Sequence, residues 1–155
     1  KYRISRLMID LIEVYNKVNN FGRENEMKLT KVEDGYIEYE MTVQEKHLAT
    51  PYAAHGGSVA AFMDGVMGVA ALTLSSKEEK LVSTVEFKVH FLKRVLLGDK
   101  LKGIGEVIQK GKRIIIAKGE IFNQKNELIA TALGTFNSYP YQKSGIPELT
   151  GSGNS

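Results

Sequence analysis

The sequence predicts an α+β domain in which a mostly antiparallel sheet of five to six strands curls around one long buried helix. An apolar segment of helical length, residues 57–75, lies between two groups of segments that alternate as strands do. The connections between these strands are short, which favours antiparallel pairing. A single apolar helix is then available to cover one face of the sheet. The length of 155 residues suits one domain of this kind.

The other elements follow in chain order. Apolar side chains over residues 4–18 recur at i, i+3, i+4 and i+7, which predicts an extra N-terminal amphipathic helix over about 3–19. Two strands are expected within 27–43, around the turn Glu33-Asp34-Gly35. Four more are expected over 81–92, 100–109, 113–122 and 127–138. The tail 142–155 is rich in Gly, Ser, Pro and Asn, so we expect it to be flexible and residues 1–141 to form the domain.

The strand expected over 81–92 shows the clearest alternation. Its pattern places Thr84, Glu86, Lys88 and His90 on one face and Val85, Phe87, Val89 and Phe91 on the other. Thr84 and Phe87 are therefore expected on opposite faces of the sheet.

Composition excludes several kinds of site. The chain has no cysteine, which rules out disulfides, thiolate metal sites and a cysteine nucleophile, and suits a reducing cytoplasm, where we expect the protein to work. The three histidines lack a metal-binding spacing, so no metal is expected. The net charge of +3 comes from scattered lysines, which favours a small anionic ligand over nucleic acid.

Membrane insertion is not expected either. The start of the chain mixes charged and apolar residues, unlike a signal peptide. The apolar helix is long enough to span a bilayer, but it carries Asp64 near its middle, where a charge is costly in lipid. We interpret it as a helix buried in protein.

Asp64 is the main candidate for chemistry. Between residues 55 and 76 only His55 and Asp64 are ionisable, and the neighbours of Asp64 are apolar. An aspartate on a buried helix needs a partner, a cleft or a function. The structural alternative is a carboxylate that caps a turn or pairs with a lysine.

The start of the same helix, His55-Gly56-Gly57-Ser58, is the second candidate. The first N–H groups of a helix lack intrahelical partners and can stabilise an oxyanion, and glycine lets a ligand approach them. Gly57 and Asp64 are roughly 10 Å apart along one helix at 1.5 Å per residue. One carbonyl group cannot contact both, so a joint reaction requires a dimer in which Gly57 of one chain faces Asp64 of the other.

These residues resemble the hotdog-fold thioesterase superfamily, in particular acyl-CoA thioesterases of the phenylacetate-pathway type. The likeness rests on the helix motif from His55 to Asp64, and on residues 83–92, 98–101 and 127–136. It implies that the Gly57 N–H polarises a thioester carbonyl and that Asp64 of the neighbouring chain activates water or attacks directly. It also implies that Thr84 positions the water and that no cofactor or metal is used. Such enzymes assemble as homodimers or dimers of dimers. His55 is a further catalytic candidate, for which shaping of the loop is favoured over acid–base chemistry.

The loop before the helix departs from this family. Family members often carry an asparagine six residues before the motif histidine and a glycine between them, where this chain has Ala49 and Tyr52. His47 and Thr50 are the possible polar substitutes.

Several further residues are predicted to contact an acyl-CoA substrate. Cations at strand ends suit the phosphates of coenzyme A. The predicted contacts are Gly56, Phe62, His90, Lys93, Arg94 and Arg113. Three alternatives stay open: a non-catalytic module that binds acyl-CoA, a hydratase or dehydratase, and a purely structural dimer.

Overall fold

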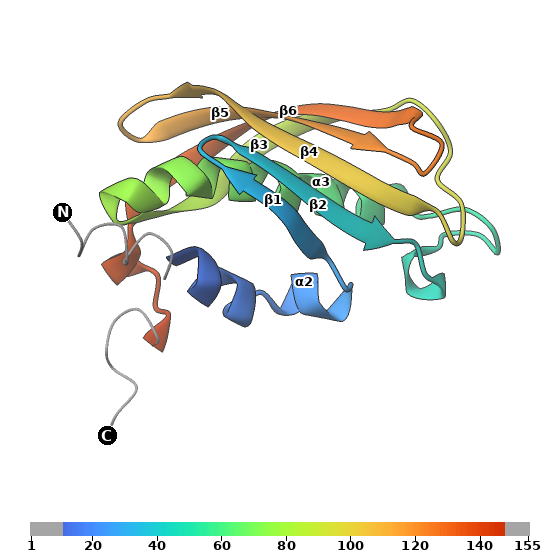
Figure 1. Cartoon of the computed structure of the whole chain (residues 1–155), viewed down its shortest axis with the longest axis horizontal. Coiled ribbons are helices and arrows are strands. Elements are labelled where there is room, and N and C mark those ends of the chain that lie inside the picture. Colours follow the sequence, from blue (N-terminus) through green and yellow to red (C-terminus); the bar gives the residue numbers. More distant parts are fainter. Residues whose placement is uncertain (1–10, 148–155) are drawn as a thin grey trace.

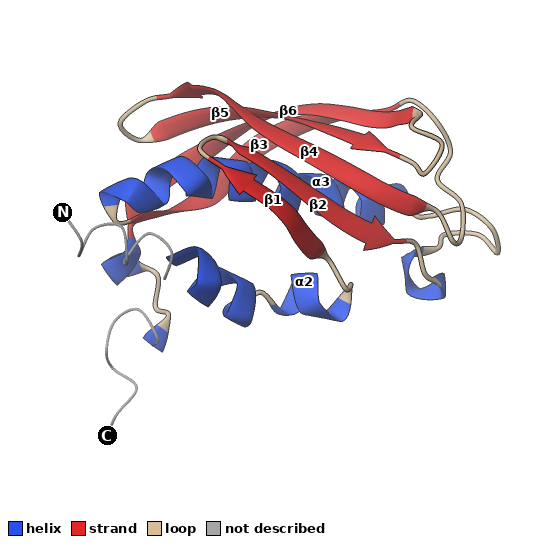
Figure 2. Ribbon diagram, in the orientation of Figure 1, coloured by secondary structure: helices blue, strands red, loops and turns tan. Residues whose placement is uncertain are grey.

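A computed structural model describes residues 11–147 as a six-stranded antiparallel sheet curled around one long helix (Figures 1 and 2). The strand order is β1-β2-β4-β5-β6-β3. The strands are β1 (Lys28–Glu33), β2 (Tyr36–Thr42), β3 (Lys80–Phe91), β4 (Lys100–Lys110), β5 (Ile114–Phe122) and β6 (Leu128–Pro140). The helices are α2 (Asn20–Glu24), α3 (Gly56–Ser75) and the 3-10 turns η1 (Glu45–His47), η2 (Ser76–Glu78) and η3 (Tyr141–Lys143). The predicted architecture is confirmed.

Helix α3 lies against the sheet at very short range because glycines of β4 and β5 face it. A Cβ atom on Gly105 would lie 2.2 Å from the carbonyl oxygen of Val66, and one on Gly103 would lie 2.3 Å from a Val66 methyl group. On β5, Gly119 makes similar room for Met63. These side-chain-free positions let the sheet wrap closely around the helix.

The core confirms that α3 is buried in protein. By length and mean hydropathy α3 matches a membrane span, the one such helix in residues 11–147. Its side chains, however, pack against all the central strands. Those with almost no exposed surface are Phe62, Met63, Val66, Met67, Val69, Ala70 and Ala71.

Segments before β1 and after β6 in the chain complete the molecule, on the same side of the sheet (Figure 1). Residues 11–18 are helical, as predicted, and continue into α2 below the open side of the curled sheet (Figure 1); the predicted helix residues 3–10 lie outside the described range. Of the tail predicted to be flexible, residues 142–147 are described. They include the end of η3, and Ile146 packs against the buried cluster of Leu11, Leu72 and Leu81. The prediction for 148–155 lies outside the described residues.

Strand β3 contains a β-bulge that the sequence pattern did not reveal. Thr84 pairs with Phe136 and Glu86 with the adjacent Thr135, so Val85 is the extra residue, 58% exposed. Phe87 pairs with Gly134, and both Phe136 and Gly134 face α3. Thr84 and Phe87 therefore share the face toward α3. Their expected placement on opposite faces is wrong, because an inserted residue shifts the alternation by one position.

Candidate active site

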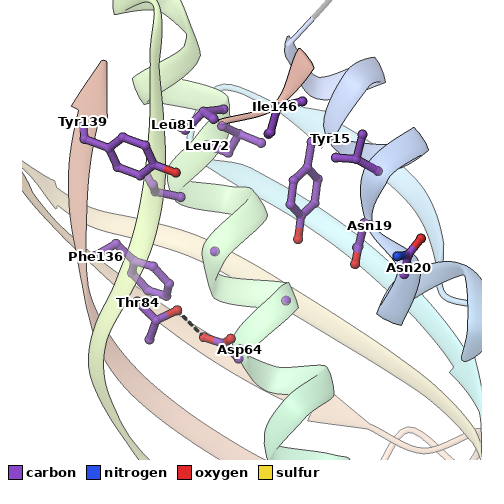
Figure 3. A pocket seen from close by; sticks show the side chains of 14 residues that line it. Tyr15, Asn19, Asn20, Asp64, Leu72, Leu81, Thr84, Phe136, Tyr139 and Ile146 are labelled. Carbon is purple, nitrogen blue, oxygen red and sulfur yellow. Dashed lines mark hydrogen bonds between the residues drawn. The ribbon is translucent and has the colours of Figure 1, made fainter. Parts of the chain in front are cut away.

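Asp64 and Thr84 form a hydrogen-bonded pair between α3 and β3. The Thr84 hydroxyl group donates to Asp64 Oδ1 at 2.6 Å (Figure 3). The bulge at Val85 is what turns the Thr84 side chain toward the helix. Asp64 is half-buried and Thr84 is exposed, so the carboxylate has a partner and still meets solvent. The structure thus brings together two residues that the sequence predicted as catalytic.

A cavity of about 360 Å³ opens beside this pair. Asp64 and Thr84 lie at one end, and apolar side chains gather at the other (Figure 3). The lining comprises Tyr15, Val18, Asn19, Asn20, Asp64, Gly65, Gly68, Leu72, Leu81, Val82, Thr84, Phe136, Tyr139 and Ile146. This division into a polar and an apolar end suits a ligand with a reactive carbonyl group and a hydrocarbon tail.

Tyr15 brings a phenol group into the cavity from the N-terminal helix (Figure 3). Burial raises the pKa of Tyr15, and the negative charge of Asp64 raises it further. The phenol therefore stays protonated and can donate a hydrogen bond. No sequence pattern points to Tyr15 as a site residue, because the helical spacing marks it only as part of an apolar face.

At the start of α3, the N–H group that is free to bind a ligand is not the one that was predicted. His55 is the N-cap residue, and its Nδ1 accepts the Gly57 N–H at 2.8 Å. The Gly57 N–H, predicted to polarise the carbonyl, is thus already bonded. The Gly56 N–H has no acceptor among residues 11–147. Gly56 is exposed, so it is the free donor at this helix start.

His47 and Thr50 have structural contacts in the loop before α3. His47 is 4% exposed; its Nδ1 accepts the Gln44 N–H at 2.9 Å, and its Nε2 lies 2.7 Å from Asn25 Oδ1. Burial lowers the pKa of His47, and the charge of Lys46 lowers it further, which suits a neutral ring that donates from Nε2. Thr50 Oγ1 accepts the N–H groups of Tyr52 and Ala53. Neither lines the cavity at Asp64.

Two other predicted substrate contacts lie away from the cavity. Phe62 is fully buried and packs edge-on against Tyr39, with ring centroids 6.5 Å apart. It therefore belongs to the core. His90 is exposed on the face of β3 opposite Val89, which packs on the core.

The predicted phosphate-binding cations lie at two ends of the sheet. Lys93 and Arg94 follow β3 and are exposed, and Lys93 forms a 3.4 Å ion pair with Glu127. The Arg113 carbonyl accepts the Ser138 N–H, near the opposite end of β3. At about 3.3 Å per strand residue, β3 separates the two ends by roughly 35 Å. One protomer does not bring Arg113 to Arg94.

A family match covers the catalytic candidates. Residues 53–130 match the family model described as "Thioesterase superfamily", and this range includes Gly56, Asp64 and Thr84. The chain belongs to the thioesterase superfamily. A Caenorhabditis elegans protein named "Putative esterase" is 30% identical over 132 residues, which cover 83% of this chain and 76% of the relative. Superfamily membership and this relative support a hydrolase that acts on thioesters.

Solved structures of the superfamily confirm the hotdog fold. The Escherichia coli PaaI protein from the phenylacetic acid degradation operon has a TM-score of 0.79 at 19% identity, over 88% of this chain and 96% of that one. A Streptococcus pneumoniae protein described as a "Hypothetical Thioesterase Protein", solved with coenzyme A, has a TM-score of 0.66 at 23% identity, over 74% and 86% of the two chains.

Proposed function

We propose that the protein hydrolyses an acyl-CoA thioester to a free acid and coenzyme A. The observation that carries this proposal is the Asp64–Thr84 pair at the polar end of the cavity, in a chain of the thioesterase superfamily. The coenzyme A in the structure of the similar Streptococcus pneumoniae protein supports a CoA ester as the substrate.

The Thr84 hydroxyl group occupies Asp64 Oδ1 and leaves Oδ2 to act on the substrate. As a general base, Oδ2 takes a proton from water while the water oxygen bonds to the thioester carbonyl carbon. The C–S bond then breaks, and the leaving thiolate takes the proton from Asp64. Direct attack by Asp64, followed by hydrolysis of the resulting anhydride, gives the same products.

The carbonyl oxygen is polarised by the Gly56 N–H of a second chain. Gly56 and Asp64 of one chain are eight residues apart on α3, or roughly 12 Å. They cannot both contact one carbonyl group, so the proposed site needs a homodimer. A homotetramer would contain two such dimers. Gly56 replaces Gly57 in this role because the Gly57 N–H is bonded to His55.

Lys93 and Arg94 are the better placed cations for the phosphates of coenzyme A. The Ala54 N–H donates to the Val95 carbonyl group, which holds the segment after β3 beside the start of α3. Both cations therefore lie near Gly56, whereas Arg113 lies at the far end of β3.

The alternative is a non-catalytic module that binds acyl-CoA. It is favoured by the loop at residues 48–54, where Ala49 and Tyr52 replace the usual asparagine and glycine. His47 and Thr50, the polar substitutes, make structural contacts instead. Retention of the Asp64–Thr84 pair favours the enzyme.

The deciding experiment measures thiol release from short, medium, long and aryl acyl-CoAs by wild type and Asp64→Asn. We expect a rate loss of about 10² to 10⁴, which is typical when a general base is removed. Glu86→Gln is the matched control, because Glu86 is a β3 carboxylate bonded to Thr135 and outside the cavity. Binding of acyl-CoA without thiol release by wild type would establish the binding module instead.

A further inference from the structure

The cavity follows helix α3 away from the catalytic pair. Its α3 lining is Asp64, Gly65, Gly68 and Leu72, which share one side of the helix at spacings of three and four residues. From Asp64 to Leu72 this side extends about 12 Å at 1.5 Å per residue. A ligand bound at Asp64 therefore has a path along the helix.

Two glycines leave the floor of this path without side chains. A Cβ atom on Gly68 would contact the Phe136 ring at 3.4 Å, and one on Gly65 would lie 3.0 Å from the end of Met27. Any larger side chain at Gly68 would enter the space between α3 and β6. The cavity is therefore bordered by α3 backbone at Gly65 and Gly68, and Phe136 and Met27 keep it narrow there.

Apolar side chains close the far end of the path. Leu72 and Leu81 belong to a buried cluster, and Tyr139 and Ile146 pack against it. Figure 3 shows Ile146 beside Leu72 and Leu81, at the end of the cavity opposite Asp64. The shape is therefore a short apolar channel with a carboxylate at its entrance and a hydrocarbon wall at its end.

We propose that this channel holds the acyl chain of the substrate and that Ile146 is its end stop, so that the protein prefers straight acyl chains of medium length. The inference rests on the proposed function and adds the substrate class. A linear hydrocarbon chain suits a channel whose floor is bare backbone and whose end is apolar, because it gains by burying its surface there.

Part of the wall of this channel comes from outside the family match. Asp64 and Thr84 lie within residues 53–130, whereas Tyr15, Phe136, Tyr139 and Ile146 lie before or after it. The superfamily segment thus carries the catalytic pair together with Leu72 and Leu81, and the flanking segments add Ile146 and the rest of the wall.

The test is the kcat/KM profile over acetyl-, butanoyl-, hexanoyl-, octanoyl-, decanoyl-, dodecanoyl- and palmitoyl-CoA. Wild type is expected to peak in the middle of the series. Ile146→Ala lengthens the channel and should move the peak to longer chains; Ile146→Trp shortens it and should move the peak to shorter ones. The change on the affected chains should be tenfold or more, because a methylene group in an apolar pocket is worth about 10- to 200-fold. Acetyl-CoA turnover should not change.

Ile108→Ala and Ile108→Trp are the matched controls, because Ile108 is 56% exposed on β4 and outside the channel. Circular dichroism verifies that each variant folds. If wild type is active and neither Ile146 variant moves the profile, the end stop is wrong while the proposed hydrolysis stands. If wild type releases no thiol from any ester, the hydrolysis is wrong. Binding of the same series by calorimetry then decides the channel: a preference that moves with Ile146 supports it, and one that does not overturns it.

Discussion

At the scale of single residues, the Thr84 hydroxyl group determines how the Asp64 carboxylate can act. The bond from Thr84 fixes one carboxylate oxygen and leaves the other to receive a proton. It also orients the carboxylate toward the cavity rather than toward a lysine, since no ion pair involves Asp64 within residues 11–147. The structural alternative of an Asp64–lysine pair is therefore not observed in this part of the chain.

Removing this hydroxyl group should impair catalysis without unfolding the protein. Thr84→Val is expected to lower kcat/KM about 10- to 100-fold, because a hydrogen bond to a charged group is worth roughly 1.5–3 kcal/mol. Thr84→Ser keeps the donor and should retain most activity. The control is Thr135→Val, which removes a hydroxyl group bonded to Glu86 outside the cavity. Equal activity of Thr84→Val and wild type would contradict the proposed role.

At the scale of elements, two glycines test how closely α3 packs against the sheet, Gly105 against β4 and Gly68 against β6. At Gly105 a Cβ atom would lie 2.2 Å from a backbone oxygen of α3, which neither element can move away from easily. Gly105→Ala should destabilise the fold by about 1–3 kcal/mol or more, the usual cost of overpacking. Gly68→Ala should raise the melting temperature, because alanine is favoured over glycine within a helix by roughly 0.5–1 kcal/mol. Thermal unfolding measures both, and a stable Gly105→Ala variant would contradict this account.

Elements were largely predictable from the sequence, and their contacts were not. The six strands and α3 follow from alternation and apolar runs, and Asp64 follows from its isolation in an apolar helix. Alternation cannot mark the bulge at Val85, so the meeting of Thr84 with Asp64 came only from the structure. The motif at His55 likewise does not tell which N–H group the histidine caps. Tyr15 and Ile146 reach the cavity through tertiary packing, which leaves no local signal.

At the scale of the whole molecule, the side of β3 that faces away from β6 is the natural place for a second chain. Among the described residues β3 pairs only with β6, and it is 12 residues long. Long unpaired edges favour association with another strand. Val85, Phe91 and Leu92 expose more than half of their surface along or just after this strand, and Gly56 lies next to the Phe91 ring. An antiparallel partner would cover these groups and bring each Gly56 toward the other chain's Asp64.

A mixed dimer tests whether the site is shared between chains. Gly56→Pro removes only the free N–H, because proline suits the first position of a helix and His55 already has the extended backbone that precedes proline. Gly56→Ala, which keeps the N–H, is its control. Both Gly56→Pro and Asp64→Asn should be inactive alone. In a symmetric dimer that re-forms at random from equal amounts, half of the dimers carry one intact site, which restores about one quarter of wild-type activity.

The matched negative control is Asp64→Asn mixed with Thr84→Val. Asp64 and Thr84 are hydrogen-bonded within one chain, so every site in this mixture keeps at least one defect. Activity should return for the Gly56→Pro mixture alone. If both mixtures stay at the level of their components while light scattering shows dimers, a site shared between Gly56 of one chain and Asp64 of the other is contradicted.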